Sequence, residues 1–222
     1  LFNDEVNFDR DLIDEARRYY TNIVGKYGPH VQALLKKAST IDIKMICPLH
    51  GPVWRNNFEY FLDKYNKWST YEPEEKGVLI VYGTMYGNTE AAANNLAISL
   101  AKKGMTNIAM YDVSKTHVSY LISESFKYSH IVLASPTYNL KIYPPMLNYI
   151  MDMKALNLQK RTFAILENGS WAPQSGKLMR ELIESMKDMT ILDSEMTISS
   201  SLKEEDADLI EEIADNIINS MK

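Results

Sequence analysis

The sequence predicts an α/β protein with an open parallel sheet in residues 77–222, preceded by a mostly helical segment in residues 1–72. Short apolar runs such as Val78–Tyr82 recur in the longer part, as expected of parallel strands that are buried on both faces. Between these runs, apolar residues follow helical spacing. Strands that alternate with helices form an open sheet with right-handed crossovers. With 222 residues, 45% of them hydrophobic, the chain is large enough for such a core.

The elements of the predicted sheet region follow in a regular order. The first helix ends at Gly104, a residue that commonly terminates helices. A later helix opens with Pro144 and Pro145, because proline suits the first helical turn. We expect strands at 78–82, 107–111, 130–134, 162–166 and 191–198. We expect helices at 89–103, 118–126, 177–186 and 204–221, in addition to the one that opens at Pro144.

The first 70 residues follow a different pattern. We expect helices at 9–27, 29–38 and 57–68, and one brief strand at 43–46. Because no second strand is visible in this stretch, its sheet partners would lie outside the sequence, or the segment packs as an appendage. The turn-rich stretch 69–77 is predicted to be a linker between the two parts.

Composition and charge exclude several classes of function. The formal net charge of −5 argues against a nucleic-acid surface, which needs an excess of Lys and Arg. No apolar run approaches the ~20 residues that cross a bilayer, and no signal peptide is visible, so we expect no membrane partner. The single cysteine, Cys47, fits a reducing cytoplasm and is interpreted as a small buried hydrophobe. The chain begins with Leu1, which suggests a fragment or a processed form.

Three loops at the carboxyl ends of predicted strands carry the groups that bind ligands, since ligands of open α/β sheets sit at that edge. The first, Gly83–Thr89, offers hydroxyls and backbone N–H groups to a phosphate at a helix N-terminus. It contains no lysine, so it is not a P-loop, and the chain has no G-x-G-x-x-G motif. A monoester phosphate fits such a loop. The alternative is an ordinary helix cap at Asn88 or Thr89.

The second and third loops suit a flat heteroaromatic ring. In the second loop, Ser135–Pro145, prolines stiffen the backbone and polar groups are available for hydrogen bonds. In the third, Glu167–Pro173, Gly169 lets the backbone approach a ligand closely and Trp171 can cover a ring face. The alternative for Trp171, and also for Tyr138, is a partly buried core aromatic. Together the three loops predict one site.

These loops resemble those of a known family. Thr84–Thr89 looks like the FMN-phosphate loop of flavodoxin-like proteins, and Ser135–Asn139 with Tyr143–Met146 looks like the flavodoxin domain of flavodiiron proteins (A-type flavoproteins). Ile46–Arg55, which contains Pro-Leu-His-Gly-Pro, resembles the end of their metallo-β-lactamase-like diiron domain. Leu140 and Lys141 depart from the small residues usual in the family. The resemblance implies that FMN is bound by Thr84, Met85, Tyr86, Gly87, Asn88, Thr89, Ser135, Pro136, Thr137, Tyr138, Asn139, Asn168, Gly169, Ser170 and Trp171.

The resemblance also implies a fold and a domain division. Residues 77–222 would form a flavodoxin-like domain with a five-stranded parallel sheet, in the order 2-1-3-4-5, and helices on both faces. Residues 1–72 would be the end of an αββα diiron domain, in which His50 matches the last iron ligand. The other ligands would lie upstream of Leu1, in a missing N-terminal half.

The implied function is electron transfer in an oxygen or nitric oxide reductase. FMN would take electrons from a rubredoxin-type donor and pass them to the diiron site of the other chain in a head-to-tail homodimer. One alternative is a free flavodoxin-like carrier with residues 1–70 as a passive remnant. Another is a structural fragment that binds nothing.

Overall fold

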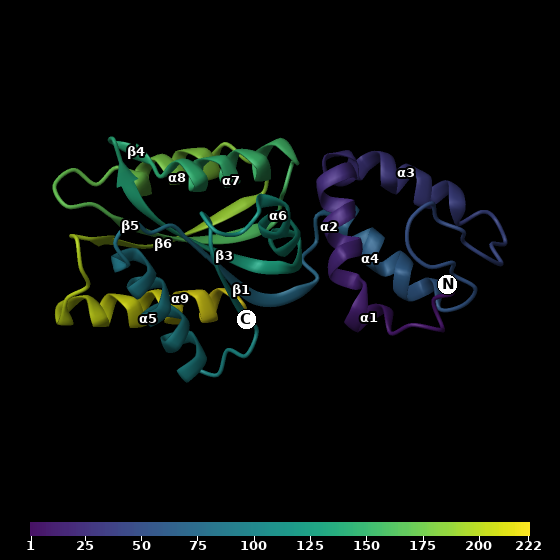
Figure 1. The fold of residues 1–222 in the computed structure, drawn as a ribbon, viewed down its shortest axis with the longest axis horizontal. Helices are drawn as coiled ribbons and strands as arrows, with labels where there is room; N and C mark the ends of the chain where they lie inside the picture. Colours follow the sequence, from purple (N-terminus) through teal and green to yellow (C-terminus); the bar gives the residue numbers. More distant parts are fainter.

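The computed structural model describes residues 1–222 and places a twisted parallel sheet beside a smaller lobe of helices (Figure 1). The main sheet has the strand order β2-β1-β3-β5-β6, and all of its neighbouring strands are parallel. In chain order this is 2-1-3-4-5, so the predicted flavodoxin-like α/β sheet is confirmed. The strands are β1 (Glu75–Tyr82), β2 (Ile108–Asp112), β3 (Tyr128–Tyr138), β5 (Arg161–Asn168) and β6 (Met189–Ile198).

Two apolar cores lie on opposite faces of this sheet, as Figure 1 shows from the two layers of helices. The face shared by α6, α7 and α8 holds Phe126, Tyr149 and Met179. The face shared by α5 and α9 holds Leu96 and Ile213. None of the helices is both long and apolar enough to span a membrane. The helices are α5 (Asn88–Lys102), α6 (Val118–Lys127), α7 (Pro144–Ala155), α8 (Ser175–Glu184) and α9 (Ala207–Ser220), the last preceded by the 3₁₀ turn Glu204–Asp206.

A short hairpin after β3 was not predicted from the sequence. Strand β4 (Lys141–Ile142) pairs antiparallel with the end of β3. The two turn residues, Asn139 and Leu140, have φ angles of 49° and 60°. Positive φ at both central residues is the geometry of a two-residue hairpin turn, and it is costly for leucine. An Asn-Leu pair lacks the glycine that usually marks this turn, so no local pattern predicts it.

The helical lobe is built around a cluster of aromatic residues that includes Phe8, Tyr20, Trp54 and Trp68. The helix expected at 9–27 is wrong as a single element, because Leu12 (φ −132°) interrupts it. The lobe contains α1 (Phe8–Asp11), α2 (Ile13–Val24), the 3₁₀ turn Gly25–Tyr27, α3 (Gly28–Ala38) and α4 (Phe58–Thr70).

The segment between α3 and α4 differs from its prediction in two ways. The strand expected at 43–46 is wrong: only one isolated antiparallel bridge forms, between Ile46 and Trp54. Cys47 is exposed, so its interpretation as a buried hydrophobe is also wrong. Both errors have one cause, since the aromatic cluster draws in Trp54 and Ile46 and nothing in this chain covers the residues between them.

A buried ion pair joins the helical lobe to the sheet. Arg17 on α2 donates from Nε to Glu74 Oε1 at 2.6 Å, and both side chains are 1% exposed. The same guanidinium also donates to Ser123 on α6, at 3.3 Å. Burial alone would raise the pKa of Glu74, but Arg17 and hydrogen bonds outweigh it and hold that pKa below its usual value. A pair of this kind fixes one orientation of α2 against the start of β1, because losing either partner would leave an uncompensated buried charge.

A second buried guanidinium, that of Arg161, lies at the amino end of β5. It donates to the carbonyls of Ser125 (2.8 Å) and Phe126 (2.8 Å) in the last turn of α6. It also donates to the carbonyl of Tyr71 (2.7 Å), which directly follows α4, and to that of Gln159 (2.8 Å). Burial lowers the pKa of Arg161 to about 9, so the group remains charged at neutral pH.

The buried imidazole of His130 predicts a pH dependence of stability. Its two nitrogens lie 2.8 Å from Ser129 Oγ and 3.0 Å from Ser220 Oγ, and burial with Lys76 nearby lowers its pKa to about 4. The unfolded chain, with a His pKa of 6.5, binds more protons between these values, so stability falls as pH drops below 6.5. From pH 7 to pH 5 the loss from this group is roughly 2 kcal/mol.

Urea unfolding of the parent chain and of His130→Gln at both pH values measures this contribution. The variant should lose roughly 2 kcal/mol less than the parent over this range. His30→Gln, which alters an exposed histidine of the helical lobe, is the matched control and should behave like the parent. Equal losses in the parent and in His130→Gln would contradict the assignment.

Candidate functional site

The loop between β1 and α5 forms an open helix N-terminus at the carboxyl edge of the sheet. Gly87, the residue before the helix, has φ +86°, a conformation that favours glycine. Its N–H donates to Thr84 Oγ1 at 2.9 Å, which folds the loop back on itself. Thr89, in the first turn, is 2% exposed. The loop is therefore held in shape by its own residues.

The first turn of α5 leaves backbone donors free. The N–H groups of Asn88, Thr89 and Glu90 have no acceptor within the helix, and no side chain caps them. Such groups, together with the helix dipole, favour an anion at this end. The Glu90 carboxylate is engaged elsewhere, since it accepts from Tyr82 Oη at 2.9 Å. Burial and this carboxylate raise the pKa of Tyr82 to about 12.

A cavity of about 240 Å³ connects this loop with the ends of β3, β5 and β6. Its lining is mostly polar, and except for Ser200 every lining residue was predicted from the sequence. The phosphate loop thus lies in one cavity with the other two predicted loops. The lining residues are Thr84, Met85, Tyr86, Asn88, Thr89, Pro136, Thr137, Asn168, Gly169, Ser170 and Ser200.

Some predicted residues lie outside this lining. Trp171 is 92% exposed, so the alternative reading of it as a partly buried core aromatic is wrong. Ser135 is fully buried, and its hydroxyl donates to the carbonyl of Pro136 at 3.1 Å. Tyr138 is 43% exposed on the β4 hairpin, next to Asn139. With Gly87, these residues shape the edge without lining the cavity, and their contact with a ligand stays a prediction.

The N-terminus of α8 lies at the same edge but is closed by the chain itself. Thr137 Oγ1 accepts from the N–H groups of Gln174 (2.9 Å) and Ser175 (3.1 Å). Glu167 Oε2 accepts from the N–H of Gly176 at 2.8 Å. Because these donors are satisfied, α8 offers no anion site, whereas α5 does.

Ser200 is the lining residue that sequence reasoning missed. It follows β6, and β6 pairs with β5, so its position at the carboxyl edge follows from the strand order. The signal in the sequence was the run Ser199–Ser201 directly after a predicted strand. That run carries no residue that identifies it as a binding segment.

His50 lies in the helical lobe, away from this cavity. It is exposed, and its ring packs against that of Tyr19 with the centroids 5.2 Å apart. No group of three or more His, Cys, Asp and Glu side chains is arranged to hold a metal ion. The residues of this chain therefore do not form a diiron ligand set, and the role of His50 stays a prediction.

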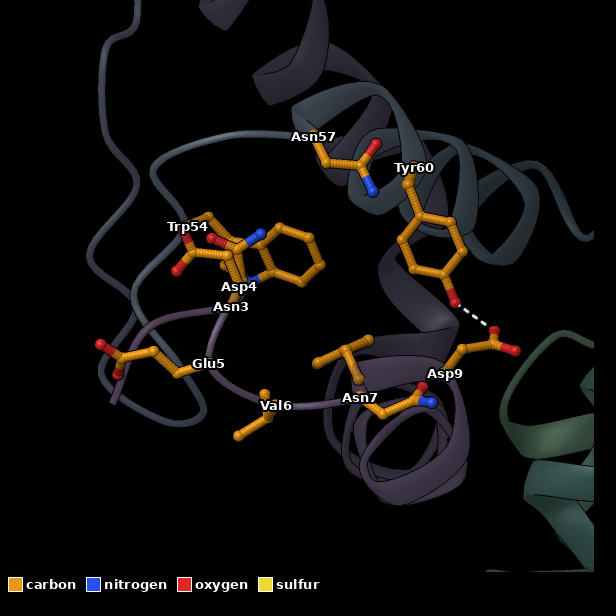
Figure 2. A pocket seen from close by; sticks show the side chains of 10 residues that line it. Asn3, Asp4, Glu5, Val6, Asn7, Asp9, Trp54, Asn57 and Tyr60 are labelled. Atoms are coloured by element: carbon orange, nitrogen blue, oxygen red, sulfur yellow. Dashed lines mark hydrogen bonds between the residues drawn. The ribbon is translucent and has the colours of Figure 1, made fainter.

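A second cavity, of about 530 Å³, lies in the helical lobe between residues 3–9 and the start of α4 (Figure 2). Its polar groups are already used within the chain. Asp9 accepts from the Tyr60 hydroxyl, as Figure 2 shows, and Asp4 pairs with Arg55 at 2.9 Å. Asn7 caps α1 by accepting from the N–H of Arg10. Although it is larger, this cavity lies in the helical lobe, apart from the edge of the sheet where the three predicted loops meet.

Comparison with known proteins agrees with the geometry of the sheet edge. Residues 80–185 match the Flavodoxin family. These residues run from β1 to the end of α8 and have a flavodoxin-like fold. An uncharacterised protein of Methanocaldococcus jannaschii is 26% identical over 87% of this chain and 49% of its own length. The anaerobic nitric oxide reductase flavorubredoxin of Escherichia coli is 25% identical over 78% of this chain and 36% of its own length.

The fold of the whole chain, helical lobe and sheet together, is found in a solved structure. Rubredoxin oxygen:oxidoreductase from Desulfovibrio gigas matches 99% of this chain with a TM-score of 0.89 and 24% identity. The match covers 55% of that protein, so this chain spans about half the length of such relatives. The resemblance to flavodiiron proteins is thereby confirmed for the fold and for the flavodoxin domain.

The closed N-terminus of α8 predicts that Thr137 matters for the stability of the flavodoxin domain. Thr137→Val keeps the shape of the side chain but removes the acceptor of two backbone N–H groups. Loss of a cap costs about 1 kcal/mol, and up to about 2 kcal/mol. Urea unfolding measures the loss. The control, Thr190→Val, alters an exposed strand residue and should change stability little; an equal effect of the two variants would argue against the capping role.

Proposed function

We propose that this chain binds FMN noncovalently and serves as an electron-transfer module. The open N-terminus of α5 carries the proposal, because it lies in one cavity with polar groups from three other strand ends. A phosphate monoester fits these free N–H groups without a cation. The flavodoxin domain supports the same ligand.

The residues divide into two groups with respect to the flavin nucleotide. Thr84, Asn88 and Thr89 would hold the phosphate through hydroxyl and backbone donors, with Gly87 supplying the turn. Asn168 and Ser170 would face the heterocycle at the other side of the cavity. When bound, FMN supplies reversible electron transfer, and the protein contributes binding, orientation and electrostatics.

The wider proposal concerns the protein in which this module works. The names of the relatives support an oxygen or nitric oxide reductase that receives electrons from a rubredoxin-type donor. In that proposal residues 1–72 belong to a metallo-β-lactamase-like diiron domain and residues 77–222 form the flavin domain. His50 would then complete a diiron site whose other ligands lie outside this sequence, in a head-to-tail homodimer.

A second candidate function is a stand-alone flavodoxin-like carrier. The observation in its favour is that every residue lining the candidate flavin cavity lies between residues 84 and 200, outside the helical lobe. In such a carrier the helical lobe would only support the sheet, through the Arg17–Glu74 pair. The two candidates share the flavin site and differ only in the iron chemistry.

The FMN proposal predicts that the hydroxyls of the phosphate loop contribute to affinity. Thr84→Ala and Thr89→Ala each remove a charge-assisted hydrogen bond, which is worth about 1.5–3 kcal/mol or roughly ten- to a hundredfold in Kd. Riboflavin, which lacks the phosphate, should bind more weakly than FMN and should be insensitive to both substitutions. Titration of the apoprotein, followed by flavin fluorescence, measures these constants.

The matched control is Thr106→Ala, which alters an exposed threonine just before β2, at the opposite edge of the sheet. Its FMN affinity should equal that of the parent chain. If Thr84→Ala and Thr89→Ala both bind FMN as tightly as the parent, the phosphate does not lie in this loop.

The reductase proposal predicts that activity requires further ligands together with His50. This chain alone should bind FMN but hold no stoichiometric iron, because one exposed imidazole does not hold iron against water and buffer. Co-expression with the N-terminal half of a related flavodiiron protein should restore NO or O₂ consumption. His50→Ala should abolish this activity and leave FMN bound, whereas His30→Ala, an exposed histidine of the same lobe, should not. Iron-dependent turnover by this chain alone would refute the proposal.

A further inference from the structure

The segment after β6 is attached to the loop after β5 at three points. The Ser200 carbonyl accepts from Asn168 Nδ2 at 2.9 Å. The Ser200 hydroxyl donates to Ser170 Oγ, also at 2.9 Å. The N–H of Gly169 donates to the carbonyl of Ile198 at 3.0 Å. Since Asn168, Gly169, Ser170 and Ser200 all line the cavity, these bonds determine the shape of one of its walls.

Ser200 has an unusual backbone conformation. Its φ angle is +70°, which is unfavourable for a residue other than glycine and persists only where surrounding contacts fix it. Its neighbours Ser199 and Ser201 carry the same side chain, and all three serines are exposed, but only Ser200 lines the cavity. The conformation therefore directs one hydroxyl of the three toward Ser170.

The wall formed by Asn168, Ser170 and Ser200 lies far from the phosphate loop. In the sheet, β1 and β6 are separated by β3 and β5. Asn168 and Ser170 follow β5, two strand spacings of about 4.8 Å from β1, or roughly 10 Å, and Ser200 follows β6, one spacing further. A ligand held by its phosphate at the end of β1 would therefore meet this wall with its opposite end.

The wall presents one donor and one acceptor to that end. Ser170 Oγ accepts from Ser200, so its own O–H is free to donate. Asn168 uses Nδ2 toward Ser200, which leaves Oδ1 free to accept. A heterocycle with a carbonyl beside a ring N–H, such as the pyrimidine ring of a flavin, complements this pair.

We propose that Ser200 is a positioning residue for the heterocyclic end of the ligand, acting through Ser170 and Asn168. The proposal rests on the proposed FMN site and adds a fourth strand end to it. Ser200 fixes which atoms of Ser170 and Asn168 face the cavity. Its contribution should be independent of the phosphate, in contrast to that of Thr84 and Thr89.

The experiment measures Kd for FMN and for riboflavin with Ser200→Ala and Ser200→Gly. Both substitutions remove the hydroxyl, and glycine also relieves the strain at φ +70°. Each variant should bind both ligands about fivefold more weakly, as expected for one neutral hydrogen bond. The ratio of the two Kd values should equal that of the parent. The matched controls Ser199→Ala and Ser201→Ala should bind as the parent does.

A double variant tests the route through Ser170. If Ser200 acts through the Ser170 hydroxyl, Ser170→Ala combined with Ser200→Ala should bind no more weakly than Ser170→Ala alone. Additive losses would overturn this route. Thermal unfolding of each apoprotein shows whether it is folded. If Ser200→Ala does not fold, Ser200→Gly, which relieves the backbone strain, replaces it in the binding experiment.

Two failures are distinguishable. If the parent binds neither FMN nor riboflavin, the proposed function is wrong. If Ser200→Ala and Ser200→Gly bind both ligands with the Kd values of the parent, the FMN site stands and the role of Ser200 is wrong. The same conclusion follows if Ser199→Ala weakens binding as much as Ser200→Ala does. A loss seen only with FMN would also overturn it, because the effect would then involve the phosphate.

Discussion

The buried guanidinium of Arg161 is the interaction on which the two-part arrangement depends. It gathers carbonyl groups from the end of α6, from the residue after α4 and from the turn before β5. A cation at the C-terminus of α6 is also favoured by the helix dipole. Because all these contacts lie at the amino edge of the sheet, the carboxyl edge remains free of the helical lobe.

Binding capacity at the carboxyl edge results from an asymmetry between two helices. The N-terminal donors of α8 are used by Thr137 and Glu167, whereas those of α5 have no partner in the chain. Both helices begin beside the same cavity, so the side chains available to each helix, and not the fold, select which of them can take an anion. The same edge then supplies polar side chains from β5 and β6 for the other end of a ligand.

The sequence predicted the regular elements well, because each depends on local periodicity. The continuous apolar run Val78–Tyr82 predicts a strand with both faces buried, and it lies between β2 and β3 inside the sheet. Predictions failed where distant contacts decide. The interruption at Leu12 and the exposure of Cys47 depend on which residues the aromatic cluster of the helical lobe takes in. The β4 hairpin depends on a leucine held at positive φ.

The sequence by itself determined the fold class, the strand order expected from its resemblance and most of the residues of the candidate site. It could do so because loops after parallel strands meet at one edge whatever their exact conformation. Only the tertiary structure decided which groups at that edge remain free. Thr137 turns out to cap a helix, Trp171 is exposed, and Ser200 enters the cavity from beyond β5. Hydrogen-bond partners distant in sequence make these choices, and no local pattern records them.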